Sequence, residues 1–351
     1  MLKKQGGDNL MPLDERKKLV LRTIVALYEK DAEPVGSGVL AEHIDTCVSS
    51  ATLRNEMAML TKLGLLEQPH TSAGRVPSAK GYRYYLDNLM EQDSALSRRE
   101  REGIEEAFDK FDYDPDRLTQ SAAKALAELT GYAVIATAPH SEDTCIAHFE
   151  VVQVGRFTAA ILGVTNAGGV RTRIAKMRFE LTSADCDTIV NLLNSAFTFR
   201  ANADVSVEYL RGVAATLGTR GGELAYPALS AALTILRELA DEKIFLEGQT
   251  NLLHCRETAA HMGDLITMCA DENAVKAYLQ PQLERTTVLL GEDIEEYPMS
   301  DICFVSRRYH AGGGRTGALN IVGPTRMSFK DIIPNLEYFA VRLGQSMTDI
   351  L

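Results

Sequence analysis

Apolar side chains recur at helical spacing through residues 13–30 and then stop. The face they form consists of Leu19, Ile24, Leu27 and Tyr28, which predicts an amphipathic helix. Acidic residues lie in its first turn, where the positive end of the helix dipole favours them. Pro34 and the glycines beside it end this helix. Ser37 is placed to cap a second, short helix that ends near Asp45.

A third helix is predicted from Ser49 or Ser50 to about Gly64. Its apolar side carries Leu53, Met57 and Leu60, and its polar side carries Ala51, Thr52, Arg54, Asn55 and Lys62. Two short helices joined by a tight turn favour a helix-turn-helix. Arginine pairs with guanine and asparagine with adenine through two hydrogen bonds each. Three-helix units that bind no nucleic acid share this pattern, so the helices alone leave the function open.

The segment after the third helix predicts a two-stranded ribbon. "LLEQ" and "VPSA" have strand character, "PHTSAGR" between them supplies a turn, and "KGYRYYLDNLM" continues as a helix. A helix-turn-helix followed by such a ribbon is a winged helix, whose loop reaches the DNA backbone or the minor groove. The side chains suited to phosphate contacts are His70, Thr71, Ser72, Arg75 and Lys80.

Three blocks of sequence carry a resemblance to a known family. They are "EPVGS", "SSATLRNEMAMLTKLGLLEQPHTSAGRVPSAKGYRYYLDNL" and, near the other end of the chain, "IVGPTRMSF". The chain resembles the heat-inducible transcription repressor family (HrcA) over essentially its whole length, with the middle third the weakest part. The family commonly has a basic residue after "EPVGS", where this chain has Gly38. The resemblance therefore carries over no phosphate contact at that position.

The resemblance implies a dimeric repressor that binds an inverted-repeat operator in double-stranded DNA upstream of chaperone operons and is released on heat stress. It implies a winged helix, a GAF-like domain and a dimerising domain inserted into the latter, with the chaperonin as folding partner and no cofactor. Carried over residue by residue, it places Ser49, Ser50, Thr52, Arg54 and Asn55 in the groove of DNA. It places His70, Thr71, Ser72 and Arg75 on the wing.

The rest of the chain predicts an α+β body with a helical insertion. A charged helix over 91–110 links it to the winged helix, and residues 145–181 form an antiparallel meander. Helices dominate 182–280, and strands then return before a last helix with a wide apolar face. We therefore predict a winged-helix domain over 1–91, a GAF-like domain over 92–180 and 281–351, and an inserted dimerisation domain over 181–280. "ALSAALTILRELA" is the candidate subunit interface, or else an internal core helix.

Charge is distributed unevenly along the chain. The net charge is −11, yet residues 1–91 hold 12 Lys+Arg and 12 Asp+Glu, so the acidity lies entirely in the body. This asymmetry permits a polyanion-binding module at the amino-terminal end. We find no apolar run of the roughly 20 residues that span a bilayer, and no signal peptide, so we expect a cytoplasmic protein without membrane contact. The six scattered cysteines indicate reduced thiols.

Two further segments contain residue types that occur in ligand and metal sites. The glycine-rich "HAGGGRTGAL" lies between two predicted strands and lacks the phosphate-loop pattern, so a glycine hairpin is expected there. His140, Cys145 and His148 lack the spacing of metal ligands, and we identify no catalytic motif, so we expect no metal site and no enzyme. An alternative to heat control is a regulator whose GAF-like domain senses a small-molecule effector.

Overall fold

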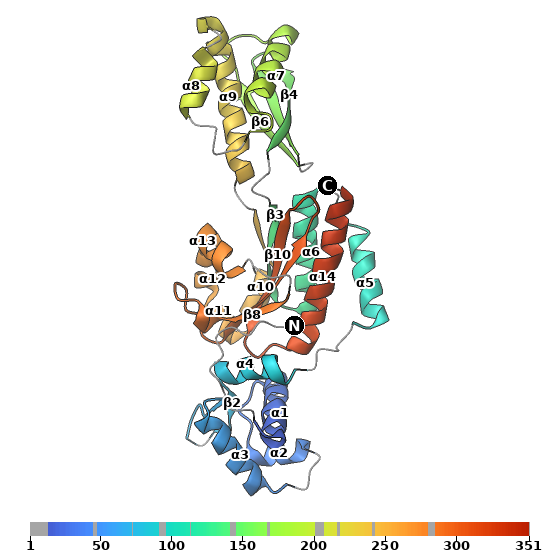
Figure 1. Cartoon of the computed structure of the whole chain (residues 1–351), viewed down its shortest axis with the longest axis vertical. Coiled ribbons are helices and arrows are strands. Elements are labelled where there is room, and N and C mark those ends of the chain that lie inside the picture. Colours follow the sequence, from blue (N-terminus) through green and yellow to red (C-terminus); the bar gives the residue numbers. More distant parts are fainter. Residues whose placement is uncertain are drawn as a thin grey trace.

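The computed structural model describes residues 13–44, 48–71, 73–90, 96–112, 114–140, 145–166, 169–200, 207–215, 218–240, 243–279 and 285–350. Figure 1 shows an elongated molecule with a winged helix at one end, a central α+β domain in the middle and an inserted unit at the other end. Among the described helices, none is both long and apolar enough to span a bilayer.

The winged helix predicted from the sequence is present. Its elements are α1 (Glu15–Asp31), α2 (Ser37–His43), α3 (Ser50–Lys62), β1 (Leu66–Glu67), β2 (Val76–Pro77) and α4 (Ala79–Asn88). Asp14 caps α1, because its carboxylate accepts a hydrogen bond from the backbone of Lys17. Gly36 is the N-cap of α2, so Ser37 is the first helical residue and not the cap that we expected.

The central domain is an antiparallel sheet in the order β7-β3-β10-β9-β8. Its strands are β3 (Ala133–His140), β7 (Ile244–Glu247), β8 (Thr287–Leu290), β9 (Ile302–His310) and β10 (Thr316–Pro324). The glycine-rich segment is the expected hairpin between β9 and β10. Gly312, Gly313 and Gly314 all have positive φ there, a conformation that favours glycine.

Helices cover both faces of this sheet (Figure 1). One face carries α5 (Arg98–Phe108), α6 (Pro115–Thr130) and α14 (Phe329–Ile350), and the other carries α10 (Gln249–Leu253), α11 (Arg256–Ala260), α12 (Met262–Ala270), α13 (Glu272–Ala274) and a π-helical turn (Val275–Leu279). A 3₁₀ turn (Gly291–Asp293) follows β8. The wide apolar face of the last helix is buried as predicted. The charged helix α5 is not an isolated linker, because the ring of Phe108 packs on the ring of Phe339 of α14, with centroids 5.6 Å apart.

The inserted unit differs from our expectation. The predicted meander is present as β4 (Ile146–Gly155), β5 (Thr158–Thr165) and β6 (Val170–Lys176), but these strands form a separate three-stranded sheet. They share their own core with α7 (Ser183–Phe197), α8 (Val207–Ala215) and α9 (Gly218–Ala240). The meander thus belongs with the helices that follow it, whereas β7 and α10–α13 belong to the central domain. The predicted boundaries at 181 and 280 do not follow this arrangement.

Two local patterns explain the remaining differences. Helix α9 runs through "RGGELAYP" and contains Pro227, although glycine and proline commonly end helices. The four residues of β7 were not predicted as a strand, because a strand this short is identified by its pairing with β3 and not by its own pattern.

Within α9, the side chains of Leu229, Ala232 and Ile235 are buried in the core of the inserted unit. The "ALSAALTILRELA" segment is therefore an internal helix.

The winged helix and the central domain share one continuous apolar core. Tyr82 of α4 meets Phe329 of α14 edge to face, with ring centroids 6.2 Å apart, and Arg83 forms an ion pair with Asp293. Glu29 of α1 is also enclosed at this junction. Burial, with a smaller contribution from the charge of Asp331, raises the pKa of Glu29 to about 8.

Candidate nucleic-acid interface

Helix α3 separates its packing residues from a polar face. Its buried side chains are Leu53, Met57 and Leu60. Ser49 caps the helix, since its hydroxyl oxygen accepts a hydrogen bond from the backbone N–H of Thr52 at 3.2 Å. On the opposite side, Arg54 and Asn55 are exposed. Within the described part of the chain, neither of these two side chains forms a hydrogen bond or an ion pair, so neither is held by a contact within the protein.

The other predicted residues of α3 lie at its amino-terminal end and orient it. The Ser50 hydroxyl donates to the Ser37 hydroxyl of α2 at 3.2 Å, which ties the first turns of the two helices together. The Thr52 and Ser49 hydroxyls are 3.0 Å apart. On the inner side, Lys17 of α1 forms an ion pair with Glu56 of α3 at 3.2 Å. The position of α3 is therefore fixed from both neighbouring helices.

The wing carries His70 and Thr71 at exposed positions, while Ser72 lies outside the described residues. Gln68 holds the turn together, because its side-chain amide donates to the carbonyl of Thr71 at 2.9 Å and to that of Ala73 at 3.1 Å. Sequence reasoning did not identify this residue. The only signal was its place at the end of a predicted strand, immediately before the turn.

Arg75 lies at the base of the wing. Its backbone pairs with Val35 in an isolated bridge, and its Nε donates to the Thr61 hydroxyl of α3 at 3.0 Å. A Cβ atom on the neighbouring Gly74 would be 2.3 Å from the Val35 carbonyl oxygen, so only glycine allows this close approach. The half-buried Arg75 thus links the wing to α3 and to the segment before α2. Lys80 is exposed at the start of α4.

The position that departs from the family pattern is also accessible. Gly38 is exposed on α2, and a Cβ atom there would meet no other atom within 4 Å. Steric crowding therefore does not explain why this chain lacks a basic residue at position 38. Among the described residues, we find no cluster of three or more histidine, cysteine, aspartate or glutamate side chains that could hold a metal ion.

Comparison with known families decides what this arrangement belongs to. The family described as "Winged helix-turn-helix transcription repressor, HrcA DNA-binding" matches residues 12–90, and "HrcA protein C terminal domain" matches residues 116–333. The chain belongs to the HrcA family. HrcA proteins are transcription repressors and not enzymes, and the DNA-binding part of the match coincides with the winged helix described above.

Individual relatives match the chain over nearly its full length. The heat-inducible transcription repressor HrcA of Desulforudis audaxviator is 31% identical, over 95% of this chain and 98% of its own length. That of Halalkalibacterium halodurans is 30% identical, over 96% and 98%. The crystal structure of a hypothetical protein superimposes with a TM-score of 0.70 at 25% identity, over 97% of this chain and all of that one. The HrcA fold therefore extends through all three units.

Proposed function

We propose that this HrcA protein binds an inverted-repeat operator as a homodimer, represses chaperone operons and is released on heat stress. The observation that supports DNA reading most directly is the exposed pair Arg54 and Asn55 on a helix whose other side is packed. The predicted groove residues Ser49, Ser50 and Thr52 surround the start of the same helix. His70, Thr71, Arg75 and Lys80 would supply backbone contacts from the wing and its base.

Substitutions in these two groups have different expected effects. Arg54→Ala removes a base contact, so it should reduce the preference for operator over random DNA by about tenfold to a hundredfold. His70→Ala should leave that preference intact and weaken binding to all DNA. Arg98→Ala is the matched control, since Arg98 is an exposed arginine on α5, outside the winged helix. Gel-shift titrations of all variants at several salt concentrations measure both quantities. Unchanged operator preference in Arg54→Ala would refute the assigned face of α3.

A homodimer is supported by the outer face of the inserted sheet. The register aligns Val152, Ala160 and Ile174 in one row across the three strands, and two rows further along the same face Val164 lies opposite Val170. Ile174 is 62% exposed and Val152 is 50% exposed, although the other face of the sheet packs on α7 and α9. Exposed aliphatic side chains grouped on one face of a sheet are typical of a protein contact. We assign the subunit interface to this face.

The dimer assignment has a direct test. Ile174→Asp should convert the dimer to a monomer in light scattering and lower operator affinity by about a hundredfold or more, because the two half-sites are no longer bound together. Leu253→Asp places the same charge at another residue, 63% exposed, on the central domain. That control should stay dimeric. A dimer in both variants would contradict the assignment.

A folding requirement for the chaperonin is supported by the topology. Val134 pairs with Ile321, and the inserted unit lies between them in sequence, so the central sheet depends on contacts that are distant along the chain. Such sheets fold slowly and leave apolar surface exposed meanwhile. Recovery of operator binding after dilution from urea should therefore rise when chaperonin is added. Equal recovery without it would remove this part of the proposal.

A further inference from the structure

The outer strands of the central sheet leave part of β9 without a neighbour. β8 pairs with β9 only from Cys303 to Ser306, whereas β10 pairs with it as far as His310. Just before β8, the Thr286 hydroxyl donates to the Glu337 carboxylate at 2.5 Å, which ties this part of the chain to α14. In the described structure, the segment Arg307–His310 is therefore an edge strand.

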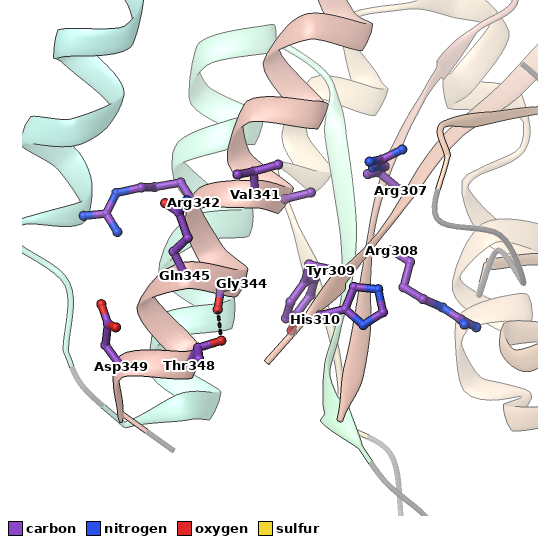
Figure 2. A pocket seen from close by; sticks show the side chains of 11 residues that line it. Arg307, Arg308, Tyr309, His310, Val341, Arg342, Gly344, Gln345, Thr348 and Asp349 are labelled. Carbon is purple, nitrogen blue, oxygen red and sulfur yellow. Dashed lines mark hydrogen bonds between the residues drawn. The ribbon is translucent and has the colours of Figure 1, made fainter. Parts of the chain in front are cut away.

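A cleft of about 580 Å³ lies between this edge and the carboxy-terminal half of α14. Its walls include Tyr309 of β9 and, from α14, Val341, Gln345 and Thr348. Figure 2 shows these groups on the two sides of the cleft, with Arg342 directed away from β9. Arg342 is already engaged, because its Nε donates to the carboxylate of Glu105 at 2.7 Å.

Two consecutive arginines on the edge have side chains without a partner in the described structure. Among the described residues, neither the Arg307 nor the Arg308 side chain forms a hydrogen bond or an ion pair, and the Nε of Arg307 is buried without an acceptor. Successive residues of a strand point to opposite faces of the sheet. Arg307 shares the face of Tyr309, and Arg308 lies on the other face. The one carboxylate among the lining residues is Asp349.

This arrangement selects one kind of occupant. An extended peptide can add to a sheet edge through backbone hydrogen bonds, with its side chains alternating between the two faces. Two consecutive acidic residues of such a peptide would meet Arg307 and Arg308, one on each face. A second copy of this edge would instead bring arginine against arginine, and like charges on paired strands repel. We infer that the β9 edge binds an extended acidic segment of another protein.

The test uses the full-length protein and a fluorescein-labelled peptide of about eight residues, with two consecutive glutamates flanked by valine and threonine. Fluorescence anisotropy should show saturable binding with a Kd of about 100 μM or tighter at low salt. Replacing Arg307 and Arg308 together by alanine should weaken binding about tenfold or more. Arg98→Ala is the control for general loss of positive charge and should bind normally. Circular dichroism confirms that each variant is folded.

Two further peptides separate strand addition from simple anion binding. Methylating alternate backbone nitrogens removes hydrogen-bond donors without changing charge, so this peptide should bind at least about tenfold more weakly when the methyl groups face the edge. Replacing both glutamates by glutamine should weaken binding to a similar degree. The inference is overturned if the labelled peptide does not bind or if the arginine variants bind it equally well. It is also overturned if both methylated registers bind like the parent, or if millimolar inorganic phosphate displaces the peptide completely.

Discussion

Glu29 gives the most quantitative prediction for this structure. Its folded-state pKa is raised from 4.5 to about 8, mainly by burial. In the unfolded chain the carboxyl ionises near pH 4.5, whereas in the folded protein it stays protonated until about pH 8. Its contribution to stability is therefore fully present below pH 4.5, is lost progressively as pH rises, and stays lost above pH 8. The full shift corresponds to about 5 kcal/mol. Because solvent still reaches part of the side chain, we expect a loss of about 2–3 kcal/mol between pH 5 and pH 8.

The variant Glu29→Gln isolates this effect, because glutamine resembles the protonated carboxyl and does not titrate. Urea unfolding of both proteins from pH 5 to pH 9, followed by circular dichroism, gives the difference in unfolding free energy. The variant should become more stable than the parent as pH rises, and the gap should stop growing above pH 8. Other titrating groups cancel in this difference. A gap that is constant across the range would refute the reasoning about this junction.

Two smaller changes test local features of the winged helix. Ser49→Ala removes the cap that accepts from the backbone of Thr52 and should cost about 1 kcal/mol in urea unfolding; an unchanged midpoint would argue against the cap. Gly81→Ala would place a Cβ atom 2.0 Å from the Leu65 carbonyl oxygen and should destabilise the domain by about 2 kcal/mol or more, measured by thermal unfolding. Gly38→Ala, which meets no atom, is its control, and equal stability of the two would contradict the predicted clash.

The winged helix could be predicted from the sequence because its determinants are local. The spacing of Leu53, Met57 and Leu60 specifies the buried side of α3, and Ser49 immediately before it supplies the cap. The exposed positions of Arg54 and Asn55 follow from the same periodicity. Arg75 is different, since its contact with Thr61 depends on how the ribbon folds back onto α3. No local pattern contains that information.

The arrangement of the sheets could not be predicted for a related reason. A meander over residues 145–181 has the same alternation whether it extends a larger sheet or forms its own. The choice is made by the distant α9, where Ile235 packs in the same core as Phe149 and Ile161. Pro227 inside α9 is a second feature that a local pattern does not predict. A proline removes one backbone hydrogen bond, and tertiary packing can compensate for that loss.

The inserted unit leaves the central domain between two strands that are themselves paired. β3 and β7 are antiparallel neighbours, Thr137 lies opposite Ile244, and the backbone N–H of Ala138 donates to the Lys243 carbonyl at 2.8 Å. The whole unit is thus an insertion in the loop of the β3–β7 hairpin. The residue pairs that join β3 to β7 include no residue of the inserted unit. Exchanging that loop for another folded module would remove the proposed subunit interface while leaving the winged helix untouched.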